Sequence, residues 1–222
     1  AEQWYHDVLT RQPQNGGLYI GLGNLELRIG KPTEAVTAYR QAIALEPANA
    51  GYYVLLGNAL EAAKKVEDAL PIYRQALTLQ PTLVDAYESL ASLYQKQQKW
   101  EEAEAAFQRG LIIAPVDGVL RVQYATFLLK REQKDKAQAL LDDAGKVAPT
   151  RATWVARAAV YKSLDRKDDA LQDLQAALAL EPGSLDVLLA LNQLYRDRGD
   201  TAQAQQTWEQ VLVLNPGLKG KK

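Results

Sequence analysis

Reactive residue types are few in this chain, and its single histidine is the first place to look for chemistry. The 222 residues contain one His and no Cys, which excludes disulfides, thiolate nucleophiles and thiolate metal sites. His6 precedes Asp7, a carboxylate that can orient an imidazole for acid–base catalysis. The helical register places His6 on an outward face, so we expect a solvated side chain and not a catalytic one.

Adjacent acidic residues are the second candidate for chemistry. Three pairs occur, at Glu101-Glu102, Asp142-Asp143 and Asp168-Asp169. Paired carboxylates can bind a metal ion or act as acid and base. Sequence neighbours on a helix point to different faces, so we expect solvated charge at each pair. No phosphate-binding glycine motif occurs either. We therefore predict a non-catalytic protein with no metal site and no cofactor.

The elements that carry these residues recur with a fixed period. Seven of the nine prolines are 34 residues apart, with one interval of 33, at Pro13, Pro47, Pro81, Pro115, Pro149, Pro182 and Pro216. Ladders of alanine and of large apolar residues keep the same spacing. Within each period apolar residues recur three and four positions apart, as on a helix. Each proline ends a helix because it cannot continue the hydrogen-bond ladder. One period therefore predicts two helices.

This pattern resembles the tetratricopeptide repeat family, whose unit is a pair of antiparallel helices. The resemblance implies an all-α fold, a right-handed superhelical solenoid of antiparallel helix pairs. We expect thirteen helices in total. One of them would be the second helix of a truncated repeat at 1–15, and the other twelve would form six tandem repeats at 16–49, 50–83, 84–117, 118–150, 151–184 and 185–216. A short basic tail would follow at 217–222.

Several positions depart from the family pattern. Arg157 stands where the family usually has Leu, and Glu26 where it has an aromatic residue. Pro71 falls about one turn into a second helix, where it should remove one hydrogen bond or bend the helix. The turn between helices keeps its usual glycine only at Gly30 and Gly199. Left-handed backbone would cost about 1 kcal/mol at each replacement, namely Lys64, Gln98, Glu132 and Asp165.

Charge and hydropathy exclude some classes of partner. The 26 basic and 27 acidic residues leave a net charge of -1, so no global positive field favours nucleic acid. A mean hydropathy of -0.29 and the absence of a long apolar run argue against a transmembrane segment. The first residues lack the basic start and apolar run of a signal peptide. The compartment stays open between cytoplasm and periplasm.

A partner-binding surface follows from the resemblance, because family members bind extended peptides or partner helices on the inner face of their first helices. In this chain that groove would comprise Ile20, Asn24, Leu27, Val54, Leu55, Asn58, Glu61, Asp85, Glu88 and Ser92. The asparagines can bond a peptide backbone, and the three acids favour a basic residue in the partner. The alternative is that the asparagines bond neighbouring helices or water. Tyr52 lies one residue off the aromatic ladder, so we expect it outside the core.

Two specialised binding modes of the family do not fit. Repeats that clamp the carboxylate of chaperone tails have a Lys four residues before the Asn, where this chain has Ile20 and Val54. The asparagine ladder of another subtype would fall at Gly21, Leu55 and Ser89.

Three functional classes remain open. The first is a non-catalytic scaffold for another protein or a peptide. The second is a self-assembling structural protein. The third is the recognition arm of a larger enzyme such as a glycosyltransferase. The repeat pattern begins in mid-repeat and its last pair has no polar cap, so we expect part of a longer protein or a homo-oligomer that forms through uncapped ends.

Overall fold

The computed structural model describes residues 1–219 and is built from α-helices. Thirteen α-helices and one short 3-10 helix account for its regular structure, and residues 1–219 contain no strand. The all-α class and the thirteen expected helices are confirmed. Residues 220–222 of the expected basic tail lie outside the described residues. None of the helices in the described range is long and apolar enough to cross a bilayer. The chain divides into two compact units, Ala1–Ala114 and Pro115–Lys222.

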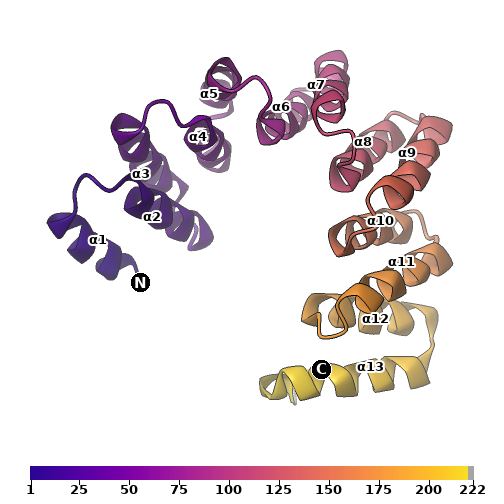
Figure 1. Cartoon of the computed structure of the whole chain (residues 1–222). Helices are drawn as coiled ribbons and strands as arrows, with labels where there is room; N and C mark the ends of the chain where they lie inside the picture. The colour runs from indigo at the N-terminus through magenta and orange to yellow at the C-terminus, as the bar shows by residue number, and fades with distance from the viewer. Residues whose placement is uncertain (220–222) are drawn as a thin grey trace. The chain divides into compact units, whose positions relative to one another are not determined.

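Unit 1 contains a single helix followed by three helix pairs (Figure 1). The single helix is α1 (Glu2–Arg11), which packs on α2. The two helices of each pair pack on each other, and α2, α4 and α6, the first helices of the pairs, also contact one another in sequence. The pairs are α2 (Gly16–Arg28) with α3 (Pro32–Leu45), α4 (Ala50–Ala62) with α5 (Val66–Leu79), and α6 (Val84–Lys96) with α7 (Trp100–Ile113).

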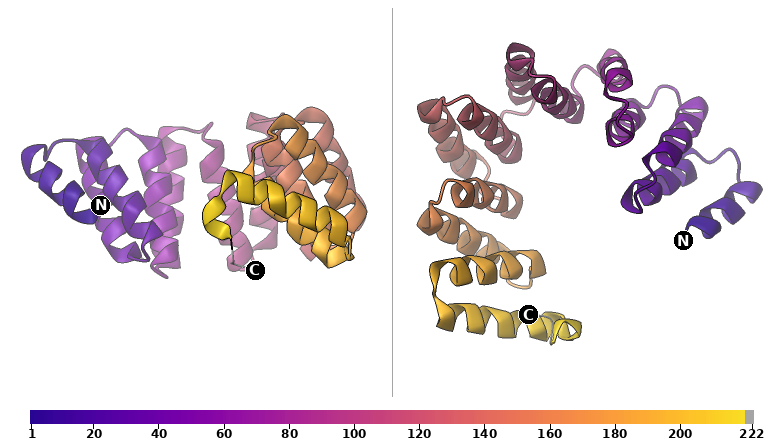
Figure 2. Two further views of the ribbon diagram at one scale, coloured as in Figure 1. Left: turned by 90° about the horizontal axis from the view of Figure 1, so that it is seen from below. Right: turned by 180° about the vertical axis from the view of Figure 1, so that it is seen from behind.

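Unit 2 repeats the same arrangement. Three pairs are followed by the 3-10 helix Pro216–Leu218. The two helices of each pair pack on each other and lie side by side in the right view of Figure 2. The first helices α8 and α10 are in contact, as in unit 1. The pairs are α8 (Gly118–Lys130) with α9 (Lys134–Val147), α10 (Arg151–Ser163) with α11 (Lys167–Leu180), and α12 (Leu185–Arg198) with α13 (Thr201–Leu214).

The periodic prolines set the ends of the second helices. Helix α3 ends at Leu45 and α5 at Leu79, each two residues before a proline, because the residue preceding a proline avoids helical geometry. Side-chain caps begin some of the first helices. The Asn15 side chain accepts a bond from Leu18 N at 3.2 Å, and Asp117 accepts one from Leu120 N at 2.9 Å. The repeated helix boundaries thus have local chemical causes.

In the first two pairs, α2 with α3 and α4 with α5, close packing depends on a glycine facing a buried tyrosine. Tyr39 and Tyr73 are fully buried. A Cβ on Gly23 would lie 2.6 Å from Tyr39 Cε1, and a Cβ on Gly57 would lie 2.3 Å from Tyr73 Cε1. The tyrosine ring therefore occupies the space that any side chain at the glycine would need.

The departures from the family pattern appear in the backbone as expected. Lys64, Gln98, Glu132 and Asp165 all have φ between 58° and 61°, so the left-handed turn persists without glycine. Pro71 lies inside α5, and the helix continues through it. Proline has no N–H to donate to the Glu67 carbonyl, so α5 has one helical hydrogen bond fewer.

Candidate partner-binding cleft

A cleft with a volume of about 480 Å³ lies along the first helices of the second and third pairs, α4 and α6. It is lined by Asn49, Gly51, Tyr52, Val54, Leu55, Asn58, Asp85, Glu88 and Ser89. Both charged side chains of this lining, Asp85 and Glu88, are acidic. Half of the residues expected from the sequence thus come together here, namely Val54, Leu55, Asn58, Asp85 and Glu88.

The other expected residues lie elsewhere on unit 1. Ile20, Asn24, Leu27, Glu61 and Ser92 do not line this cleft. Val54 was expected to offer an apolar contact to a partner, but it is 6% exposed. Val54 lines the cleft, but packing turns most of its side chain into the core, so only a small part of it can contact a partner. The binding role of all ten residues stays a prediction.

A polar network ties the end of the cleft to the neighbouring helices. Tyr73 Oη lies 2.7 Å from Asn58 Oδ1 and 2.6 Å from Glu61 Oε1, and Lys96 Nζ lies 2.6 Å from Glu61 Oε2. Ser89 Oγ donates to Asn58 Oδ1 over 3.2 Å. Burial and the Glu61 carboxylate raise the pKa of Tyr73, which keeps the phenol protonated.

Tyr73 has one phenolic proton for two neighbouring oxygens. If the proton goes to the Glu61 carboxylate, Asn58 can turn its amide and donate to Tyr73 through Nδ2. Asn24 has a simpler environment, because Tyr39 Oη donates to its Oδ1 over 2.7 Å and Leu27 stands at the position that corresponds to Glu61. Burial raises the pKa of Tyr39 to about 12. Both asparagines therefore bond core tyrosines, which was the alternative considered for them.

The prediction from the sequence missed Asn49 and Gly51 as parts of the cleft. Asn49 stands 34 residues after Asn15 and precedes α4 as Asn15 precedes α2. Unlike Asn15, its side chain makes no capping hydrogen bond, so the amide can face a ligand. Tyr52 was singled out as lying off the aromatic ladder, and it lines the cleft while its hydroxyl donates to Glu46 Oε2 over 3.3 Å. The position of Tyr52 one residue off the aromatic ladder was the feature of the sequence that pointed to this cleft.

The candidates for catalysis are separated in the structure. Asp7 accepts a hydrogen bond from Gln3 Nε2 over 2.9 Å, and His6 instead faces Glu2 and Glu26. The members of two acidic pairs, Asp142-Asp143 and Asp168-Asp169, have different partners, as expected for helix neighbours. Gln138 donates to Asp142 over 2.8 Å, while Arg121 forms an ion pair with Asp143 at 2.7 Å.

Comparison with known proteins gives a consistent picture. Two family models, both described as tetratricopeptide repeat, match residues 20–84 in one case and residues 60–119 and 165–217 in the other. Among curated proteins, the chain is 36% identical over 74 residues to bacteriophage adsorption protein A of Escherichia coli strain K12, a match covering 33% of this chain and only 7% of that protein.

Solved structures share the fold at low sequence identity. A thermophilic TPR protein of Thermus thermophilus superposes with a TM-score of 0.65 at 21% identity, covering 81% of this chain and 98% of that one. Yeast Tom70 gives a TM-score of 0.68 at 17% identity, covering 96% of this chain and 54% of that one.

Proposed function

Because the chain belongs to the tetratricopeptide repeat family, we propose that it is a non-catalytic scaffold that binds a basic segment of another protein in the cleft along α4 and α6. Repeats of this family form protein-interaction scaffolds. For this chain we further propose the cleft along α4 and α6 as the binding site and a basic segment as the partner.

The observation that carries the proposal is the combination of acidic and apolar surface in this cleft. Asp85 and Glu88 line it together with Leu55, Tyr52 and the Asn58 amide. A Lys or Arg side chain has a matching shape, since its aliphatic stem can lie on apolar surface while its charged end reaches a carboxylate. Glu61 is paired with Lys96 and does not line the cleft, whereas Asp85 and Glu88 do. These two acids are the ones we propose to attract the partner.

A peptide array tests this preference. Each peptide pairs an apolar residue with Lys, Arg or Glu, and fluorescence anisotropy measures its affinity for the 222-residue chain. We expect basic peptides to bind and acidic ones not to. The Asp85→Asn, Glu88→Gln double variant should weaken basic peptides by about tenfold or more, since hydrogen bonds to charged groups contribute about 1.5–3 kcal/mol each.

Two matched controls separate the cleft from charge and stability in general. Glu101→Gln, Glu102→Gln makes the same change of charge at exposed positions of α7 and should leave the affinity unchanged. Asn58→Ala and Asn24→Ala each break a bond to a core tyrosine, but only Asn58 lines the cleft. We expect Asn58→Ala alone to weaken binding, by about 1–3 kcal/mol. Equal affinity for acidic and basic peptides would contradict the proposal.

Self-association is a second candidate function, favoured by an apolar cleft in unit 2. Leu178, Leu188, Val213 and Leu214 line this cleft, whose volume is about 360 Å³, and Val213 is 80% exposed. Exposed apolar surface of this kind favours association. Light scattering should show a mass that rises with concentration and a monomer for Val213→Lys. Ile112→Lys, at a position 71% exposed in unit 1, is the control and should still associate.

A further inference from the structure

Glu26 is a buried carboxylate without a complete set of partners. It lies on α2, is 4% exposed, and its Oε2 has no hydrogen-bond partner among residues 1–219. The corresponding residues of the next repeats are Leu60, Tyr94 and Leu128, so this position otherwise holds apolar or aromatic side chains. An unpaired buried charge is costly, and its presence here calls for a ligand.

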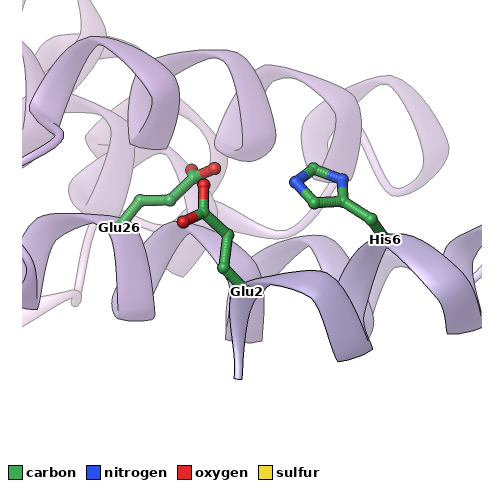
Figure 3. A group of neighbouring side chains, drawn as sticks. All are labelled: Glu2, His6 and Glu26. Atoms are coloured by element: carbon green, nitrogen blue, oxygen red, sulfur yellow. The ribbon is translucent and has the colours of Figure 1, made fainter.

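Two side chains of α1 face this carboxylate (Figure 3). Glu2 and His6 are four residues apart and therefore share one face of the helix. Their ligand atoms and that of Glu26 all lie within 4.8 Å of one another, and in the figure an edge of the His6 ring points toward the two adjacent carboxylates. The charged groups around the site are Glu34 and Lys31. Burial, followed by the charges of Glu2 and Glu34, raises the pKa of Glu26.

We propose that Glu2, His6 and Glu26 form a binding site for a divalent first-row transition metal ion such as Zn²⁺. One imidazole nitrogen with two carboxylate oxygens is a ligand set that suits Zn²⁺, whereas Mg²⁺ and Ca²⁺ prefer oxygen ligands throughout. The ion would give the Glu26 carboxylate a partner and neutralise the charge of two adjacent carboxylates. Ligand bonds of about 2.0–2.2 Å require the donors to close by side-chain rotation.

The site is open to solvent, and a lysine side chain competes with the metal ion for one of its three ligands. His6 and Glu26 line a cleft of about 540 Å³ between α1, α2 and α3, so an ion can enter without helix movement. Lys31 Nζ lies 2.8 and 2.9 Å from the two oxygens of Glu2. The ammonium group and the metal ion therefore compete for Glu2. A fourth ligand position stays open to water, as in other zinc sites with three protein ligands.

Titration calorimetry of the 222-residue chain with ZnCl₂ tests the site. We expect one ion per chain. His6→Gln and Glu26→Gln should each weaken binding by at least about tenfold, the lower end of what indirect changes around a metal already cost. Lys31→Gln should tighten binding, because it frees Glu2. Glu34→Gln removes a neighbouring acid that is not a ligand, and should cost less affinity than either ligand variant. Co²⁺ absorption in the visible range would report imidazole coordination directly, and His6→Gln should remove it.

Clear outcomes would overturn the proposal. One is the absence of Zn²⁺ binding by both the wild type and Lys31→Gln. Another is equal loss of affinity in Glu26→Gln, His6→Gln and Glu34→Gln, which would indicate general attraction to acidic surface. Equal affinity for Mg²⁺ and Zn²⁺ would contradict the role of the imidazole. Circular dichroism of each variant checks that it is folded, and His6→Gln and Lys31→Gln alter residues outside the core.

Discussion

Units 1 and 2 each contain a charged residue where the repeat pattern favours an apolar or aromatic one, and the surroundings of the two charges differ. In unit 2, Arg157 Nη2 lies 2.5 Å from Asp173 Oδ1, Arg157 Nε lies 2.7 Å from Asp173 Oδ2, and Arg157 Nη1 donates to the Leu141 carbonyl over 3.1 Å. The guanidinium also lies 4.6 Å from the centre of the Trp154 ring. In unit 1, burial and the charges of Glu2 and Glu34 raise the pKa of Glu26, and its Oε2 has no hydrogen-bond partner among residues 1–219.

This difference shows that a charged residue in a repeat core can be interpreted from the partners that surround it. Asp173 is 2% exposed but has a complete counter-charge, and this carboxylate raises the pKa of Arg157. The Arg157–Asp173 ion pair therefore has a structural role, and no ligand is needed to account for it. Glu26 is similarly buried, and its Oε2 has no hydrogen-bond partner among residues 1–219, which makes it a candidate for ligand binding. The following predictions test this contrast.

The largest effect should come from breaking the complete pair. Arg157→Leu leaves Asp173 buried without a counter-charge, and we expect the free energy of unfolding to fall by about 3–5 kcal/mol. Urea denaturation followed by circular dichroism measures it. Arg157→Leu, Asp173→Leu removes both charges and should recover most of the loss. A single variant as stable as the wild type would show that the pair is not effectively buried.

The opposite sign is expected at the incomplete site. Glu26→Leu replaces an unpaired carboxylate with the residue found at Leu60, and should raise the free energy of unfolding by about 1–3 kcal/mol when a chelator keeps metal ions away. The same denaturation experiment gives the value. A loss of stability would mean that Glu26 has a structural partner and would remove the contrast with Arg157.

The pH dependence of this gain sharpens the comparison further. The pKa of Glu26 is raised above its ordinary value of 4.5, so the folded chain holds this proton more tightly than the unfolded chain. The wild type therefore loses stability as pH rises through the folded pKa. We expect the advantage of Glu26→Leu to grow from pH 4 to pH 7. An advantage that shrinks over that range would contradict the raised pKa.

The smallest changes in stability should come from the left-handed turns and should be alike in both units. They can then serve as a reference for the larger changes at Arg157 and Glu26. Lys64→Gly in unit 1 and Asp165→Gly in unit 2 relieve left-handed backbone with φ of 61° and 58°, partly offset by the entropy of glycine in the unfolded chain. We expect gains of up to about 1 kcal/mol for each, measured by denaturation. Gains of opposite sign in the two units would show that the turns differ for reasons beyond the backbone.

The fold was accessible from the sequence because its determinants are local. The periodic prolines predict where the second helices end, and apolar residues three and four positions apart predict the helices themselves. The cleft was only partly accessible, because it depends on how α4 and α6 pack. Asn15 and Asn49 occupy the same register and have the same side chain, yet only Asn15 makes a capping hydrogen bond.

The cluster around Glu26 was not predicted. The departure of Glu26 from the family pattern was visible, but its neighbours Glu2 and His6 belong to another helix and are at least 20 residues away in the chain. Helix periodicity places His6 on an outward face without specifying what lies opposite. Only the packing of α1 on α2 brings the imidazole to the buried carboxylate.

Pro71 has a consequence for the dynamics of unit 1. The first turn of α5 lacks the hydrogen bond that the proline cannot donate, so it should open locally more often than the corresponding turns of α3 and α7. Amide hydrogen exchange would then be fastest at the start of α5 among these three helices. Tyr73, two residues beyond Pro71, bonds Asn58 at the wall of the cleft. Local opening at the start of α5 would therefore occur close to a residue that holds the wall of the cleft in place.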